Sequence, residues 1–182
     1  MAKMTDGKTI EGEHNITEYE GKIKKIFYKK QPTIPEETIS AIRNADMIIL
    51  SMGSLFTSIL PNLIVKKMIN EIDKSNAKIM YVCNIMTQPG ETDGFTASDH
   101  INTINSYLGK RKIDTVIVNN GIITPEIIKK YSVLEQKDPV KIDKEKIDPK
   151  VKIVECDLID ISSGTICHDL LKLGFNIFSC TL

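Results

Sequence analysis

Residues 78–100 read KIMYVCNIMTQPGETDGFTASDH, and this stretch decides the fold class. Its first eight residues, KIMYVCNI, are mostly apolar and β-branched, which is typical of a strand that is buried on both faces. The residues that follow are rich in acids, threonines and glycines, and they predict a polar loop. Helical spacing resumes at Thr96, which can cap a helix because Asp99 follows at the third position. The stretch therefore predicts a buried strand, a polar loop and a helix.

The same order of strand, turn and helix recurs along the chain from Asp46 onward. Strands that alternate with helices pair in parallel through right-handed crossovers. We therefore predict an α/β fold, Rossmann-like and doubly wound with a mostly parallel sheet, in a single domain over residues 1–182. Short runs at 8–13 and 22–29, separated by turn-forming residues, predict a β-rich N-terminal segment. The expected strands of the main sheet are 46–50, 78–85, 114–120 and 151–159, and the expected helices are 33–45, 55–75, 96–110, 124–131 and 165–174.

Composition and charge place the chain among ordinary globular proteins. The 24 basic and 24 acidic residues cancel, and only 5% of the residues are aromatic, so nothing supports nucleic-acid binding. No apolar run approaches the roughly 20 residues that span a bilayer. The first residues, MAKMTDGKTI, lack the apolar core of a signal peptide. Together with four scattered cysteines and no CxxC pair, this indicates a protein of the reducing cytoplasm with no membrane partner.

One segment, residues 133–150, departs from the alternating pattern. It is dense in charged residues of both signs and contains two prolines. We therefore expect a solvated surface loop.

Polar residues gather where three of the expected strands end, and ligands of doubly wound sheets bind outside the carboxyl ends of the strands. After the first strand, Gly53 permits a tight turn, and hydroxyl groups follow near the start of a helix. Free amides at a helix N-terminus attract anions, so a phosphate could bind there. Ordinary helix capping explains the same residues, and the sequence leaves both interpretations open. The candidate residues are Gly53, Ser54, Thr57 and Ser58.

The loop after the second strand, MTQPGETDG, is the second candidate region. Turn formation explains its Pro89-Gly90 and Asp93-Gly94 pairs. It explains less well why a Gln, a Glu and an Asp lie at the ligand-binding edge. Carboxylates there could bind a hydrated Mg²⁺ or accept hydrogen bonds from sugar hydroxyls. The candidate ligand-binding residues are Thr87, Gln88, Glu91 and Asp93, and the candidate metal ligands are Glu91 and Asp93.

Asparagines at strand ends complete the candidate pocket. Asn84 lies at the end of the second strand and Asn119 at the end of the third, where their amides could read a base or a sugar. A turn at Asn120-Gly121 is a simpler explanation for the second asparagine of that pair. No histidine has the spacing of a zinc site, and the sequence contains no GxGxxG, no GxxxxGK[ST] and no nucleophile elbow. The pattern predicts a ligand pocket without naming a catalytic residue.

Two stretches, SMGSLFTSILPNLIV (Ser51–Val65) and YVCNIMTQPGETDGFTASDH (Tyr81–His100), resemble the gluconeogenesis factor family of bacteria. That family belongs to the CofD-like superfamily of 2-phospho-L-lactate transferase. The resemblance implies a cytoplasmic regulatory protein that binds UDP-sugars and is linked to carbon metabolism, to the supply of cell-wall precursors and to cell shape. It also implies that His168, near the last helix, belongs to the ligand site.

The transferase relatives imply an alternative function. They move a phospholactyl group from a guanosine diphosphate carrier to a deazaflavin with a divalent metal, so a CofD-like transferase with Mg²⁺ is the second interpretation. A third is an interaction module that binds no ligand. The resemblance does not imply that the gluconeogenesis factors catalyse a reaction.

The chain departs from the family pattern in two respects. Members resemble one another in a glycine-rich GGGTG turn and an acidic DDGGS segment, and residues 1–182 contain neither. The resemblance therefore implies a truncated chain that matches the carboxyl-terminal part of a member. The last helix of members tends to begin with Arg-His-Asp, whereas here Cys167 precedes His168, which removes a charge-assisted bond to a diphosphate. We expect the chain to bind a UDP-sugar weakly or not at all, and to form a homo-oligomer through an exposed sheet edge and apolar helix faces.

Overall fold

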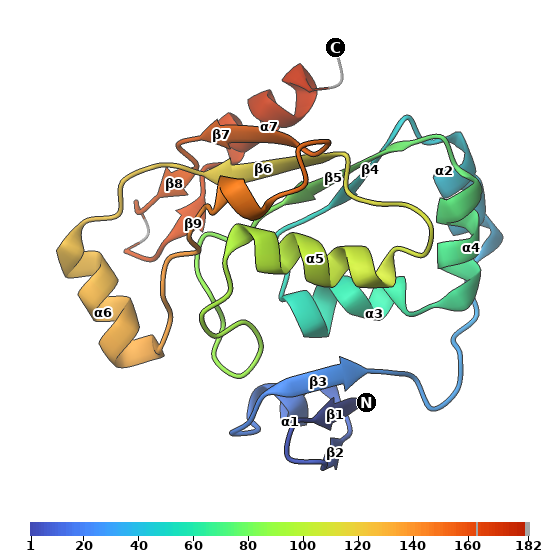
Figure 1. The fold of residues 1–182 in the computed structure, drawn as a ribbon, viewed down its shortest axis with the longest axis horizontal. Coiled ribbons are helices and arrows are strands. Elements are labelled where there is room, and N and C mark those ends of the chain that lie inside the picture. The colour runs from blue at the N-terminus through green and yellow to red at the C-terminus, as the bar shows by residue number, and fades with distance from the viewer. Residues whose placement is uncertain (163, 181–182) are drawn as a thin grey trace.

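The computed structural model describes residues 1–162 and 164–180, which are arranged around a four-stranded parallel sheet (Figure 1). Its strand order, β4-β5-β6-β7, follows the order of the chain. Helical segments connect each strand to the next, as the alternating pattern predicted, and the α/β fold is confirmed. The strands are β4 (Met47–Leu50), β5 (Lys78–Val82), β6 (Thr115–Asn119) and β7 (Lys152–Cys156).

Strand residues point alternately to the two faces of the sheet, and each face has its own core. The larger core includes Ile79, Tyr81 and Val116 from the strands. Several helical segments pack against these side chains and cover this face (Figure 1). They are the π-helical turn η1 (Leu55–Ile59), α3 (Leu60–Leu63), α4 (Lys66–Lys74) and α5 (Ala97–Tyr107).

The smaller core lies on the opposite face and includes Met80, Val82 and Ile117 from the strands. Leu173 of α7 (Leu170–Ser179) packs against them. Among the residues that the structure describes, α7 is the one helix with side chains in this core. Figure 1 shows α7 on the side of the sheet away from α3 and α5. The two faces are therefore covered unequally.

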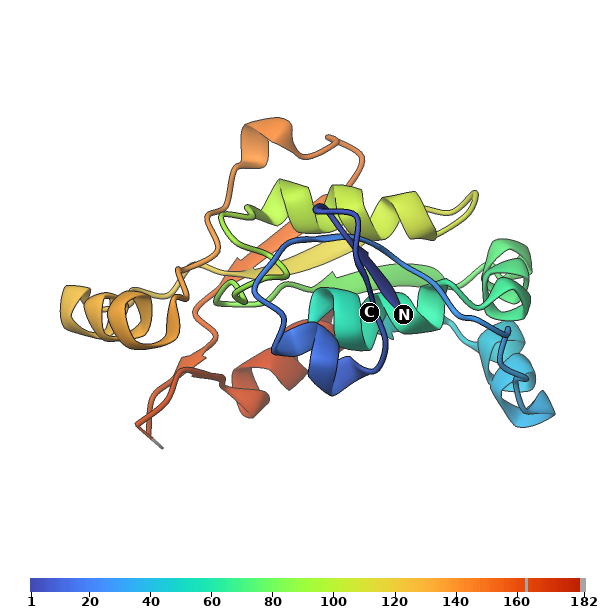
Figure 2. The same ribbon diagram turned by 90° about the horizontal axis from the view of Figure 1, so that it is seen from below.

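The N-terminal segment forms a small antiparallel sheet in the order β2-β1-β3. Ala2 and Met4 are buried and belong to the larger core. Figure 2, seen from below, shows this segment in front of the main sheet. The predicted β-rich segment is present, although the sequence indicated neither its first strand nor its helix. The elements are β1 (Ala2–Met4), β2 (Thr9–Ile10), α1 (Glu13–Thr17) and β3 (Ile23–Ile26).

The helix predicted over residues 55–75 is divided into η1, α3 and α4. Pro61 cannot donate the backbone hydrogen bond that a continuous α-helix would require, and the wider turn of η1 precedes α3 at this point. At Val65 the backbone becomes extended, with a ψ of 106°, and α4 starts in a new direction. There α4 packs against α2 (Glu36–Asn44). The apolar stripe continues across the bend, which is why periodicity predicted a single helix.

Residues 133–150 lie largely at the surface, as their charge predicted, but part of the segment packs on the core. The first of them belong to α6 (Pro125–Glu135), which ends at Gln136 with a left-handed φ of 53°. The chain then returns along the larger core, where Val140 packs and Ile147 is buried. We call residues 137–151 the returning segment. Most of its residues are exposed, as their charge predicted, but the prediction missed Asp143 and Ile147, which are buried between the exposed charges.

The last helix begins later than the predicted range of 165–174. Asp169 initiates α7, because its Oδ1 accepts the backbone N–H groups of Leu171 and Lys172, both at 3.0 Å. The helix does not end at Gly174, as the sequence predicted, but continues to Ser179. Leu173 before the glycine and Ile177 after it both pack into the smaller core, which stabilises the continuous helix. The remaining short elements are η2 (Lys144–Lys146), β8 (Ile159–Asp160) and β9 (Cys167–His168). None of the helices in the described ranges has the length and apolar character that crossing a bilayer requires.

Two carboxylates hold the N-terminus of α5. Thr96 and Asp99 form the predicted capping box. Asp143 of the returning segment accepts the Ser98 backbone N–H at 3.0 Å and the Ser98 hydroxyl at 2.6 Å. Burial opposes ionisation of Asp143, but these hydrogen bonds outweigh it and lower the pKa of the carboxyl to about 2. Asp143 therefore ties the returning segment to α5.

The substitution Asp143→Asn is expected to lower the free energy of unfolding by about 1–3 kcal/mol at neutral pH, because hydrogen bonds to a buried charge are lost. The folded pKa lies below the unfolded value, so the stabilisation is full above a pH of about 4 and disappears as the pH falls toward 2. Urea unfolding of both proteins over this pH range measures the effect. The exposed Glu145→Gln in the same segment is the control, and equal losses in the two variants would contradict the prediction.

Candidate functional site

The carboxyl ends of the parallel strands bring their loops to one edge of the sheet, and the first two loops are in direct contact there. Asn84, just after β5, donates from Nδ2 to the carbonyl oxygens of Met52 at 3.4 Å and Gly53 at 3.3 Å. Its Oδ1 accepts the hydroxyl of the buried Tyr81 at 3.0 Å. The structure thus brings Asn84 and Gly53 together as predicted, but the Asn84 amide is used within the protein.

A second contact joins the same loops at Ser54 and Gln88. Gln88 Nε2 donates to Ser54 Oγ at 2.8 Å. Gly53 is needed here for packing, because a Cβ at this position would lie 2.9 Å from the Cβ of Ser58. The loops of residues 53–58 and 83–96, the latter called the β5 loop below, therefore lie side by side at the sheet edge.

The carboxylate of Glu91 occupies the N-terminus of η1. Its Oε2 accepts the backbone N–H of Phe56 at 3.0 Å, and its Oε1 accepts the hydroxyl of Thr57 at 2.9 Å. The side chain is buried, and burial raises the pKa of Glu91 in spite of these hydrogen bonds. This N-terminus is where the sequence left a phosphate site and ordinary helix capping as open alternatives. A phosphate at these amides would have to displace the protein's own anion.

In this arrangement Glu91 and Asp93 do not fit a Mg²⁺ site. Both oxygens of Glu91 accept hydrogen bonds from the protein. Mg²⁺ requires near-octahedral oxygen ligands and usually keeps several waters. Asp93 Oδ2 accepts the backbone N–H of Gly90 at 2.8 Å and closes a turn. Within residues 1–162 and 164–180, no group of three or more His, Cys, Asp or Glu side chains is placed to hold a metal.

Thr87 connects the β5 loop to the returning segment. Its backbone N–H donates to the Asp138 carbonyl oxygen at 2.8 Å, and its Oγ1 accepts the Asp138 N–H at 2.9 Å. The Thr87 side chain is buried. Thr87 therefore has a structural role, because it binds the returning segment, which the sequence assigned to solvent.

Asn119 and His168 hold the loops that follow β6 and β7. Asn119 Oδ1 accepts the N–H groups of Gly121 at 3.2 Å and Leu158 at 2.9 Å, and so joins the ends of these two strands. His168 Nε2 lies 3.3 Å from the carbonyl oxygen of Cys83. Burial lowers the pKa of this histidine. His168 is therefore held at the end of β5, and its role in ligand binding stays a prediction.

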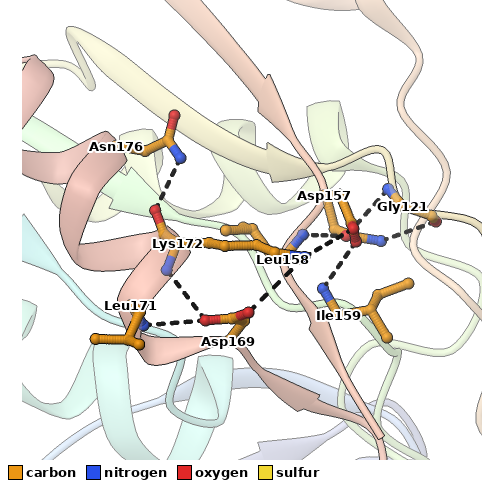
Figure 3. Close-up of polar contacts among 9 residues, drawn as sticks. Gly121, Asp157, Leu158, Ile159, Asp169, Leu171, Lys172 and Asn176 are labelled. Carbon is orange, nitrogen blue, oxygen red and sulfur yellow. Dashed lines mark hydrogen bonds and ion pairs between the residues drawn. The ribbon is translucent and has the colours of Figure 1, made fainter.

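Polar contacts continue from this point to the start of α7 (Figure 3). Lys172 Nζ lies 2.8 Å from Asp157 Oδ2 and 3.7 Å from Asp169 Oδ2. A Cβ at Gly121 would overlap Asp157 Oδ1, so the glycine allows this approach. The backbone N–H of Asp169 donates to the Leu158 carbonyl oxygen at 2.7 Å. These contacts anchor α7 at the carboxyl edge of the sheet.

Open space lies beside the β5 loop, in two pockets. One has a volume of about 620 Å³, and Phe95, Ile128 and Lys141 are among the residues that line it. The other has a volume of about 630 Å³ and lies between the β5 loop and the N-terminal segment. Sequence reasoning missed all three named residues. Phe95 could have been noticed as the aromatic residue of a polar loop, whereas Lys141 carried no signal in a segment assigned to solvent.

Comparisons with known proteins identify the family. Residues 1–159 match the family model described as 2-phospho-L-lactate transferase CofD. The chain is also 42% identical over 175 residues to the gluconeogenesis factor of Bacillus subtilis. The matched region covers 95% of this chain and 55% of that protein. The chain belongs to the CofD-like gluconeogenesis factor family.

Two further comparisons also show high similarity over only part of the other protein. The gluconeogenesis factor of Halalkalibacterium halodurans is 41% identical over 146 residues, which covers 80% of this chain and 45% of that protein. A crystal structure of a Bacillus halodurans protein matches with a TM-score of 0.90 and 35% identity, covering 97% of this chain and 57% of the other. The chain thus spans about half the length of the family members that it matches.

The substitution Glu91→Ala is expected to lower the free energy of unfolding by about 1–3 kcal/mol, because Phe56 N–H and the Thr57 hydroxyl lose a buried acceptor. Amide hydrogen exchange at Phe56 should accelerate as η1 loosens. The exposed Glu20→Ala is the control, since its side chain is accessible to solvent. Unchanged exchange at Phe56 in Glu91→Ala would show that the carboxylate does not hold η1.

The raised pKa of Glu91 gives this prediction a pH dependence. A carboxyl whose folded pKa exceeds its unfolded value stabilises the protein most at a pH below the unfolded value, and this contribution is lost as the pH rises through the folded pKa. The free energy of unfolding of the wild type should therefore fall relative to that of Glu91→Gln as the pH rises from about 4 to neutrality. A constant difference between the two would contradict the prediction.

Proposed function

We propose that this chain is a cytoplasmic regulatory protein of the gluconeogenesis factor type that binds a nucleotide sugar, of the UDP class, in the pocket beside the β5 loop. In this function it responds to nucleotide-sugar supply and acts on carbon metabolism, cell-wall precursor supply and cell shape. The observation that carries the proposal is the pocket of about 620 Å³ at the carboxyl edge of the sheet. Its volume falls within the range of roughly 300–1,000 Å³ that is typical of small-ligand sites.

Phe95 supplies an aromatic surface for the uracil base. Its ring meets the ring of His100 edge-on, with centroids 5.5 Å apart, and His100 is buried. His100 Nδ1 lies 2.9 Å from the Thr96 carbonyl oxygen, and this contact fixes the His100 ring against which Phe95 packs. Stacking of a base on an aromatic side chain contributes about 1–3 kcal/mol. Gly94 leaves open space beside its backbone, where a ligand can approach closely.

The charged residues that line the Phe95 pocket suit a diphosphate better than those that line the pocket next to the N-terminal segment. Lys141 supplies an ammonium group and is accompanied in the lining by a single carboxylate, that of Asp138. The other large pocket is lined by three carboxylates and one ammonium group, from segments 17–22 and 89–93. Like charges at short range repel, so a diphosphate is disfavoured there.

Two features limit the expected affinity. Glu91 already occupies the amides at the N-terminus of η1. Cys167 is exposed and offers no cation at the position where the resemblance implies an arginine. We therefore expect a dissociation constant in the millimolar range, which corresponds to about 4 kcal/mol of binding free energy.

Titration of the isotope-labelled chain with UDP-N-acetylglucosamine, followed by NMR, tests the proposal. We expect fast-exchange shifts of the backbone amides of residues 94–96 and 141. Lys141→Ala should weaken binding roughly 10-fold or more, since one charge-assisted contact is lost. Phe95→Ala should weaken it to a similar extent.

The matched control is Lys110→Ala, an exposed lysine in the loop that follows α5. It should leave the dissociation constant unchanged. Uridine monophosphate should shift the same amides less, because it carries one phosphate fewer and no sugar substituent. Absence of shifts at residues 94–96 with the ligand at about ten times the expected constant would refute the proposed pocket.

Transfer of a phospho-acyl group is the second candidate function, because the matching family model is described as a transferase. The geometry offers no fitting carboxylate pair for Mg²⁺ at Glu91 and Asp93. Phosphorus NMR of the chain with a nucleotide diphosphate donor and Mg²⁺ would show consumption of the donor if the chain were a transferase. Binding without turnover favours the regulatory function.

A further inference from the structure

Helix α7 is apolar on two sides. Toward the sheet, Leu173 and Ile177 lie one helical turn apart and pack into the smaller core. On the other side, large apolar side chains are open to solvent. They are Leu170 (76% exposed), Leu171 (87%), Phe175 (73%) and Phe178 (71%).

These exposed side chains form one continuous stripe, which we call the outer face of α7. Residues four apart on a helix are neighbours, so Leu171 adjoins Phe175, and Gly174 lies between Leu170 and Phe178. A surface helix normally carries charged or polar residues on the side away from the core, so large apolar residues on that side of α7 require an explanation. Large exposed apolar patches on soluble proteins mark interaction sites. The outer face therefore indicates a protein interface.

The charge on α7 is neutralised within the chain. Lys172 is the single charged residue in the sequence of this helix. Asp157 and Asp169 hold its ammonium group, at 2.8 Å and 3.7 Å (Figure 3). Two α7 helices can therefore approach each other without repulsion between their lysines.

We propose that the outer face of α7 binds the same face of a second copy of this chain, about a two-fold axis. A two-fold interface requires a patch that is complementary to itself. Gly174 makes the stripe complementary to itself, because no atom lies within 4 Å of the position where its Cβ would be. An aromatic or leucine side chain of the second copy can enter this space between the large side chains.

The exposed area is close to what a stable dimer requires. Side chains of this size that are about three-quarters exposed offer on the order of 600 Å² per chain. A standard interface buries about 800 Å² per partner.

Sedimentation equilibrium of the full chain tests the proposal. We expect a dimer of 20.4 kDa chains. The double substitution Leu171→Lys and Phe175→Lys should raise the dimer dissociation constant at least about 100-fold, because it places unpaired charges at the centre of an apolar interface. The control is Val133→Lys with Leu134→Lys, a neighbouring pair on α6 that is 69% and 72% exposed. It should leave the constant within about threefold, because substitutions outside an interface act independently of it.

Two further measurements guard against misfolding of the lysine variant. Leu171→Ser with Phe175→Ser removes the same contacts without adding charge and should also weaken the dimer. Amide shifts of the wild type on dilution should be confined to α7 and its surroundings.

A wild-type chain that stays monomeric, or a dimer that survives both α7 variants, overturns the proposal. So does a monomer that instead binds, through α7, the part of the Bacillus subtilis gluconeogenesis factor with no counterpart in this chain. That result would assign the outer face to a different polypeptide.

Discussion

The buried carboxylate of Glu91 is the contact on which the carboxyl edge of this sheet depends. It belongs to the β5 loop, yet it accepts hydrogen bonds from Phe56 and Thr57 at the start of η1, which follows β4. A carboxylate that leaves water is tolerated only if hydrogen bonds replace its hydration. The two loops must therefore keep their relative position as long as Glu91 is buried. The hydrogen bonds of Asn84 to Gly53 and of Gln88 to Ser54 also hold the two loops together.

This arrangement separates the residues that build the edge from the residues that are free to meet a ligand. Most of the polar side chains that converge at the edge satisfy one another. In the described ranges, no buried side-chain nitrogen or oxygen lacks a hydrogen-bond partner. Open space lies instead beside the β5 loop, where Phe95 and Lys141 line a pocket. A ligand would bind against a rigid wall that is already internally bonded, which lowers the entropy that ordering the site would otherwise cost.

The two faces of the sheet are covered to different extents. One face is closed by several helical segments and the N-terminal sheet. The other is covered by α7, which Asp157, Asp169 and Lys172 fix at the carboxyl edge. The helix that anchors the loops of β6 and β7 thus also presents an apolar surface outward. Family members of about twice this length share the same core, with a TM-score of 0.90 for one of them.

Several features followed from the sequence alone because they depend on neighbours in the chain. The apolar runs and helical stripes predicted the parallel sheet, and Thr96 with Asp99 predicted the capping box of α5. Parallel order also predicted that the candidate loops would meet at one edge, since the carboxyl ends of parallel strands share it. The motifs in residues 51–65 and 81–100 indicated the family that the comparisons then showed.

Other features were decided only by the tertiary structure. Whether Glu91 binds a metal or caps η1 depends on a partner, Phe56, that lies 35 residues away along the chain. Whether residues 133–150 face solvent depends on the core against which Ile147 packs. The sequence by itself determined which polar groups reach the carboxyl edge, because strand periodicity and turn chemistry are local. The tertiary structure decided which of those groups bond to each other, because long-range contacts alone determine which donor meets which acceptor.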